Sequence, residues 1–144
     1  DSGATWTNIF NTTTTLTYNN LINNNTFPIT IMYRAVVKSG VCPTENSSAA
    51  TITIDPETVG GTVAFDATVC KNSNSGTLTL TGQVGIVLSW EYSIDGGVTW
   101  TNIANTTTTQ NYTNLTNTTI YRAVVKSGVC PSANSSPAPS RLTL

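Results

Sequence analysis

The sequence predicts an all-β protein built from tandem β-sandwich repeats, the first of which lacks its N-terminal half. Long segments of the chain occur twice, and short segments alternate apolar and polar residues. Glycine, proline, asparagine and aspartate interrupt these segments about every 8 to 12 residues, as they do in sandwiches. No segment combines helical periodicity with capping residues. These observations favour two packed sheets over a helical or mixed fold.

Two blocks of sequence define the repeat. Residues 6–9, Trp-Thr-Asn-Ile, return as residues 100–103, and each copy continues into an asparagine and four threonines. Residues 33–43, Tyr-Arg-Ala-Val-Val-Lys-Ser-Gly-Val-Cys-Pro, return unchanged as residues 121–131. The offset is 94 residues for the first block and 88 for the second, because the first copy has a six-residue insertion around residues 23–30. Self-similarity of this kind predicts a repeat architecture.

The first copy begins within a repeat. Asp1 aligns with Asp95, so we expect residues 1–55 to be the C-terminal half of one repeat and residues 56–144 to be a complete one. Two explanations remain open. Either the chain is a fragment of a longer polypeptide, or its open sheet edge is completed by a strand from an identical subunit, which would build a fibre.

Alternating segments mark the expected strands, at residues 51–54, 77–81, 86–94, 121–125 and 141–144. In residues 86–94 the even positions are apolar or aromatic, so Trp90 is expected to point into the core. In the strand after it, Tyr121, Ala123 and Val125 share one face. Between the repeats, the glycine pair at positions 60 and 61 is expected to let the linker bend.

The composition is that of an extracellular protein with few charges. Charged residues make up 9% of the chain, against about 25% in an ordinary globular protein, and threonine and asparagine supply the polarity. With a net charge of −1, no histidine and scattered lysines, the chain has no basic patch for nucleic acid. No apolar run approaches the roughly 20 residues that span a bilayer, so we expect no membrane insertion.

Three cysteines raise the question of a disulfide. Cys42 and Cys130 occupy the same place in the repeat, whereas Cys70 has no counterpart in the first copy. The simplest interpretation is a Cys70–Cys130 disulfide, with the partner of Cys42 outside this segment. Such a bridge would add about 4 kcal/mol of stability and would imply an oxidising compartment. The alternative is three reduced thiols. The cysteine spacing and the lack of histidine exclude the usual metal sites, so no cofactor is expected.

The sharpest short motif predicts a structural hairpin. Ser93, Asp95, Gly97, Thr99 and Trp100 match the Ser-x-Asp-x-Gly-x-Thr-Trp pattern of an Asp-box, in which the aspartate accepts hydrogen bonds from turn amides. Asp-boxes also occur once per blade in sialidase propellers. Here the motifs lie 94 residues apart and no arginine cluster accompanies them, so we interpret the aspartate as a turn former.

Catalysis is not expected from this sequence. Without histidine, a nucleophile would depend on scattered carboxylates and lysines for a base, and only Glu91 with Asp95 flanks one hairpin as a weak pair. A binding role is the stronger alternative, with Trp6, Trp100 and Phe27 as candidate contacts for surface glycans or other partners. We favour the simpler explanation of the insertion that contains Phe27, which is a tolerated loop extension.

The order of these motifs resembles a known family. An early Val-Cys, the Trp-x-Tyr-Ser-x-Asp-Gly-Gly-x-Thr-Trp hairpin and the Tyr-Arg-Ala-x-Val-x-x-Gly-x-Cys segment are similar to the immunoglobulin-like repeats of large Bacteroidetes surface proteins exported by the type IX system. The resemblance implies that Cys70 and Cys130 form the module's disulfide, that Trp90 is the core residue of strand C and that Tyr121 opens strand F.

The resemblance also implies a function. These repeats occur in giant adhesins and in multidomain hydrolases, so the chain is expected to be a non-enzymatic stalk or filament module of a secreted cell-surface protein. Its expected partners are neighbouring repeats or identical subunits. The alternative is a carbohydrate-binding accessory module of a secreted hydrolase.

Overall fold

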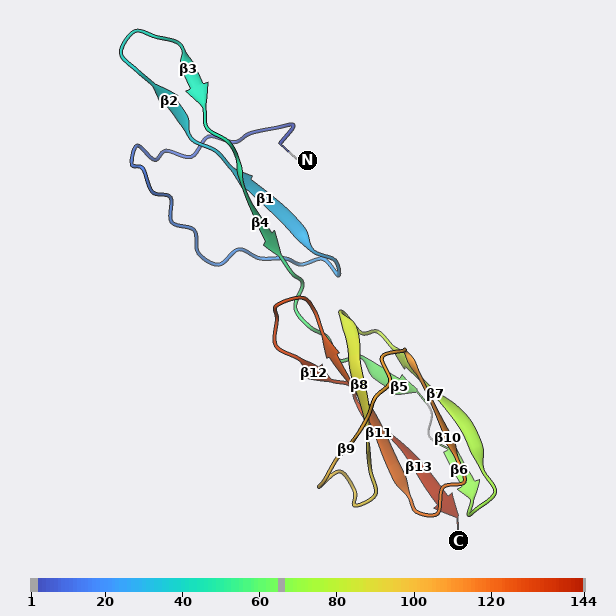
Figure 1. The fold of residues 1–144 in the computed structure, drawn as a ribbon. Coiled ribbons are helices and arrows are strands. Elements are labelled where there is room, and N and C mark those ends of the chain that lie inside the picture. Colours follow the sequence, from blue (N-terminus) through green and yellow to red (C-terminus); the bar gives the residue numbers. More distant parts are fainter. Residues whose placement is uncertain (1–2, 65–66, 144) are drawn as a thin grey trace. The chain divides into compact units, whose positions relative to one another are not determined.

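The computed structural model describes residues 3–64 and 67–143 (Figure 1). The regular secondary structure in these ranges consists of β-strands, which confirms the all-β prediction. Among the described residues there is no helix long and apolar enough to cross a membrane. The chain divides into two compact units, Asp1–Asp55 and Pro56–Leu144, which we call unit 1 and unit 2. This division falls at the residue where the sequence repeat places it.

Unit 2 contains two sheets (Figure 1). The smaller has the strand order β10 (Thr109–Thr113), β7 (Ser75–Thr81) and β5 (Thr62–Ala64). The larger has the order β6 (Ala67–Cys70), β13 (Ala138–Thr143), β11 (Thr119–Lys126), β8 (Ile86–Ser93) and β9 (Thr101–Ile103), and β12 (Ala133–Asn134) also pairs with β11. Strand β11 therefore has neighbours on both edges.

One buried cluster holds the two sheets of unit 2 together. Its nine hydrophobic members are Val63, Leu78, Leu80, Val87, Trp90, Tyr112, Tyr121, Ala123 and Val125. Both sheets contribute to it, so the sheets pack face to face. The inward position predicted for Trp90 is confirmed, as is the shared face of Tyr121, Ala123 and Val125.

The alternation predicted for residues 86–94 holds only in part. Strand β8 pairs Ser89 with Val124 and Val87 with Val125, and the register shifts between these pairs. Leu88 is left over as a β-bulge, and such an extra residue turns the preceding side chains to the opposite face. Val87 is therefore buried, while Ile86 and Leu88 are exposed, contrary to the prediction.

The glycines after Pro56 are built into unit 2 and do not serve as a hinge. Val59 pairs with Val84 in a two-residue bridge. Gly60 is buried, and a Cβ at this position would lie 2.0 Å from the carbonyl oxygen of Asn134. The expectation that the pair lets the linker bend is wrong. Their missing side chains instead allow two backbone segments to approach closely.

Unit 1 has two small sheets. One pairs β1 (Ile29–Tyr33) with β4 (Ala50–Ile54), and the other pairs β2 (Val36–Lys38) with β3 (Thr44–Asn46). With the offset of 88 residues, β1 and β2 correspond to β11, β3 to β12 and β4 to β13. The registers correspond too: Tyr33 lies opposite Ala50, as Tyr121 lies opposite Ala138.

Two segments of unit 1 remain without regular structure although their counterparts are strands. Residues 7–9 correspond to β9 and residues 15–19 to β10. In unit 2, β9 pairs with β8 and β10 pairs with β7. Residues 3–55 contain no copy of β7 or β8, and a strand without a partner is not stable in water.

Burial follows from the missing strands. Five members of the unit 2 core, from Val63 to Trp90, lie on β5, β7 and β8 and have no counterpart in unit 1. None of residues 3–55 is buried. Val37 is 59% exposed, whereas Val125, at the same place in an identical stretch of sequence, is fully buried.

Candidate functional site

A network of side-chain hydrogen bonds holds the turn between β8 and β9. Ser93 Oγ donates to Asp95 Oδ1 at 2.7 Å and accepts from the backbone N–H of Gly97 at 2.8 Å. The Asp95 carboxylate also accepts from the backbone N–H groups of Val98 and Thr99 and from the Thr99 hydroxyl. The indole N–H of Trp100 donates to the carbonyl of Gly97 at 3.0 Å.

These contacts give Asp95 the role of a turn former. The Thr99 hydroxyl contributes most to holding the pKa of Asp95 far below its ordinary value, followed by the Thr99 backbone N–H and the Ser93 hydroxyl. A carboxylate that accepts several hydrogen bonds is stabilised in its charged form. Such a group stays ionised at neutral pH and does not act as a general acid.

An arginine and a carboxylate lie against the tryptophan that follows the turn. The Arg122 guanidinium lies 3.8 Å from the centre of the Trp100 ring, and its Nε donates to Glu91 Oε2 at 2.6 Å. Arg34 lies in the same way over Trp6, at 4.0 Å from the ring centre. Within the described part of the chain, the ion pair of Arg122 has no equivalent at Arg34.

A group of tyrosines also recurs. The rings of Tyr112 and Tyr121 lie 6.4 Å apart in unit 2, and those of Tyr18 and Tyr33 lie 6.2 Å apart in unit 1. Burial raises the pKa of Tyr121, so its phenol is neutral at physiological pH. Beside Tyr92, an open cleft of about 290 Å³ reaches the polar residues Gln110, Asn114, Asn117 and Thr119.

A family model for a domain of unknown function, DUF8696, matches residues 1–56 and 59–139. The chain belongs to the DUF8696 family. No curated protein and no solved structure matches it. The two matched segments of this DUF8696 chain meet next to the boundary between unit 1 and unit 2.

The structure contradicts the predicted Cys70–Cys130 disulfide. All three cysteines are free thiols. The carbonyl of Cys70 accepts from Asn74, which also bonds the Leu115 carbonyl near the start of β11, whereas the Cys130 thiol donates to the Pro56 carbonyl beyond the other end of β11. Eight residues of strand span about 25 Å, and a disulfide needs Cα atoms about 5.5 Å apart.

The order of the two cysteines along the chain does not reveal that β6 runs parallel to β13 and carries Cys70 to the far end of the larger sheet. Cys42 is likewise an exposed free thiol. Its expected bond to a cysteine outside this segment was inferred from the same pairing and loses that support.

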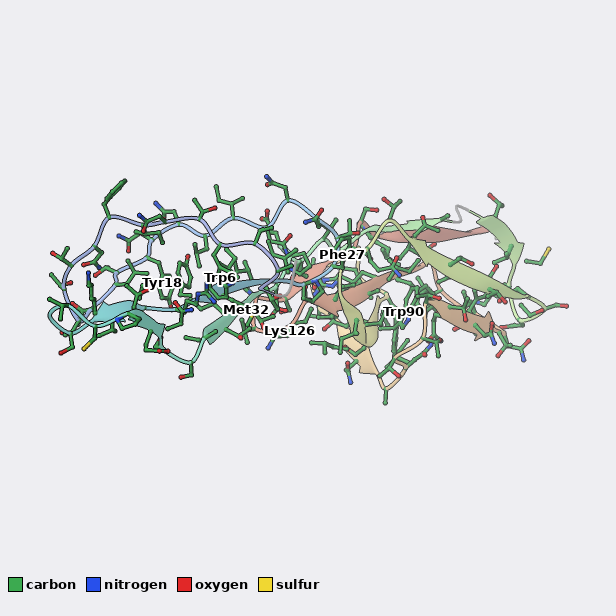
Figure 2. All side chains as sticks on the ribbon, turned by 90° about the horizontal axis from the view of Figure 1, so that it is seen from above. Trp6, Tyr18, Phe27, Met32, Trp90 and Lys126 are labelled. Atoms are coloured by element: carbon green, nitrogen blue, oxygen red, sulfur yellow. The ribbon has the colours of Figure 1, made fainter. Side chains whose placement is uncertain are left out.

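The other candidate contacts do not converge on one site. Phe27 is 61% exposed in the insertion, where the Asn23 side chain donates to the carbonyls of Phe27 and Ile54 and so fastens the loop to the end of β4. Figure 2 shows Trp6 and Phe27 in unit 1 at separate places. Among the described residues, no three acidic or cysteine side chains gather into a cluster that could hold a metal.

Arg122 and Arg34 belong to the contacts of this site but are not among the residues that the sequence motifs indicate. Each arginine stands directly after the tyrosine of the repeated Tyr-Arg-Ala run, so period-two alternation places it on the opposite face from the core. That signal was available. The tryptophan that each arginine covers lies about 20 to 30 residues earlier in the chain, and only the paired sheet brings the two together.

Proposed function

We propose that this chain is a non-enzymatic structural and adhesive segment of a large secreted cell-surface protein. Its units are immunoglobulin-like repeats that form a stalk or filament, and neighbouring repeats or further subunits are its partners. The low charge and the abundance of threonine and asparagine support an extracellular location, since such a surface remains hydrated without strong electric fields.

The main support is the recurrence of whole contacts between the two units. Both units contain an Arg–Trp stack and a Tyr–Tyr pair. In both, the indole N–H of the stacked tryptophan, Trp6 or Trp100, also donates to a turn carbonyl. Contacts that return in each repeat serve the scaffold, because a specific ligand site usually occurs once. A series of such scaffolds behaves as a quasi-one-dimensional rod.

The connection between the units also suits a stalk. The last strand of unit 1 ends at Ile54, and Pro56 is already buried in unit 2, where its carbonyl accepts from the Cys130 thiol at 3.3 Å. Asp55 is the one residue between the end of β4 at Ile54 and the buried Pro56. Little free chain remains to be extended when the ends of the protein are pulled.

Single-molecule stretching of the full chain tests load bearing. Unit 2 should open in one event that lengthens the chain by the extended length of its residues, roughly 300 Å, less the distance between the ends of the folded unit. The variant Trp90→Ala, which removes the largest core side chain, should open at lower force. Absence of a discrete event in the unaltered chain would contradict a mechanical role.

A glycan array on the full chain tests the alternative, a carbohydrate-binding module. The cleft beside Tyr92 with its amide side chains is the observation that favours this alternative. Against it, an arginine covers one face of the indole of Trp6 and one face of the indole of Trp100, so neither of these two faces is free to stack on a sugar. Saturable binding that is lost in Trp100→Ala or Tyr92→Ala would replace the spacer proposal with a lectin.

A further inference from the structure

The edge of unit 1 that corresponds to the β8 side of β11 is open. Among residues 3–55, β1 pairs with β4 and β2 pairs with β3, whereas β11 also pairs with β8 along seven residues. Unpaired strand edges in a sheet are sites for the addition of another strand. Val37 and Tyr33, whose counterparts Val125 and Tyr121 lie in the core of unit 2, are exposed and half-buried respectively.

One contact of the missing strand is already half assembled. In unit 2, Glu91 of β8 bonds Arg122, which lies over Trp100. In unit 1, Arg34 lies over Trp6, and no carboxylate of the described residues forms an ion pair with it. The arginine is thus fixed in the position that a glutamate on an added strand would meet. Fixing one partner in advance reduces the entropy lost when the pair forms.

We propose that β1 and β2 are the acceptor edge for a strand with the sequence pattern of β8 that lies outside residues 1–144. This proposal rests on the proposed function and names the partner within it. The strand pairs antiparallel in the register that Ile86–Ser93 adopts on β11. Its tryptophan lies opposite Ala35, its glutamate opposite Arg34 and its tyrosine opposite Tyr33, as the equivalent residues do in unit 2.

The added strand has a second neighbour. In unit 2 the other edge of β8 pairs with β9, with Trp90 opposite Ile103 and Tyr92 opposite Thr101. The corresponding residues 7–9 follow Trp6, and the stack with Arg34 ties Trp6 to the residue directly after β1. The incoming strand therefore lies between residues 7–9 and the β1–β2 edge, and residues 7–9 become a strand when it binds.

The β8 of a second copy is not the donor. Trp90 and Val87 are buried in their own unit, and seven residue pairs hold β8 to β11. Removing that strand would expose the core of unit 2, at a cost that one equivalent strand in unit 1 does not repay. The donor is a β8-type strand that has no partner of its own.

A peptide with the sequence of residues 85–95 tests the proposal on the full chain, with hydrogen exchange as the readout. We expect saturable binding and slowed exchange at residues 7–9 and at β1 and β2, with unit 2 unchanged. In the peptide, replacing the glutamate at position 91 with glutamine should weaken binding about five-fold, the size of a partly exposed ion pair. In the chain variant Arg34→Gln, the same replacement in the peptide should not change the binding affinity.

The variant Arg122→Gln is the matched control, because its arginine lies at an edge that β8 already occupies. It should bind the peptide as the unaltered chain does. Since a free peptide loses much entropy on binding, residues 85–95 should also be fused ahead of residue 1 through a flexible Gly-Ser linker. Protection of β1 and β2 in the fusion supports the proposal.

Three results would overturn it. These are no protection in the fusion, protection confined to unit 2, or dimers of the unaltered chain that protect β1 without added peptide. None of these results depends on the stretching experiment. The mechanical role and the strand acceptor can therefore fail independently.

Discussion

Units 1 and 2 contain the same eleven-residue run and bury it to very different extents. Along β11 the side chains from Thr119 to Lys126 alternate between buried and half-buried, while β2 of unit 1 is exposed throughout. The residues are identical, so their own propensities cannot explain the difference. What differs is the presence of β5, β7 and β8, which carry most of the core. Burial in a sheet is a property of the neighbours that a strand has.

Short-range contacts show the opposite behaviour, because they are the same in both units. The Asn11 side chain bonds Thr13 and the Thr15 carbonyl at 2.7 to 2.8 Å. Asn105 bonds Thr107 and the Thr109 carbonyl at 2.7 to 2.9 Å. These threonine-rich loops close on partners two to four residues away, so they form whether or not the sandwich around them is complete.

The substitution Trp90→Ala should give the largest difference in stability between a change in unit 2 and the matching type of change in unit 1. Trp90 is fully buried, its indole N–H donates to the Thr107 carbonyl at 2.8 Å, and its counterpart is absent from unit 1. Truncation of a buried tryptophan costs about 3 to 5 kcal/mol. Urea unfolding of the full chain, followed by circular dichroism, should show this loss. Trp6→Ala, in the half-built unit, should change the transition by less than about 1 kcal/mol.

A paired substitution separates sequence from environment. Val125→Ala should destabilise the chain by about 2 kcal/mol, because it opens a cavity in a packed core. Val37→Ala changes the same residue in the same local sequence and should cost less than about 0.5 kcal/mol, because the side chain is mostly exposed. Equal effects of the two substitutions would show that unit 1 is buried in solution and would break the comparison.

The hairpin gives a smaller, pH-dependent effect. Because the folded-state pKa of Asp95 is depressed, its contribution to stability is fully present above the unfolded value of about 3.9. That contribution is lost as the pH falls below this value toward the folded pKa. The carboxyl carbon of Asp95 should therefore show no titration midpoint above about pH 3 in folded protein. A midpoint near 4 would mean that the turn hydrogen bonds are not formed.

The cysteines should give the smallest effect. A thiol reagent should label three groups per unfolded, unreduced chain, and dithiothreitol should leave the urea midpoint unchanged. Cys42 and Cys70 are exposed and should react in the folded state, whereas Cys130 is partly covered and should react more slowly. A shift of the urea midpoint on reduction would show that a disulfide is present, contrary to the structure.

Much of the complete unit was predictable because it depends on local patterns. Alternation identified Trp90 and the face of Tyr121, and the Ser-x-Asp-x-Gly-x-Thr-Trp spacing identified the hairpin. The failures came where distant segments meet. The bulge at Leu88, the packing of Gly60 against Asn134 and the position of Cys70 each depend on another strand far away in the sequence.

By itself the sequence determined the repeat, the boundary between its copies and the turns, because each depends on residues close together in the chain. Only the tertiary structure decided which of the repeated segments became strands and which side chains became core. A strand completes its hydrogen bonds and covers its apolar face only through neighbours that the sequence supplies at a distance. Residues 3–55 retain turns of the repeat, but without counterparts of β7 and β8 none of these residues is buried.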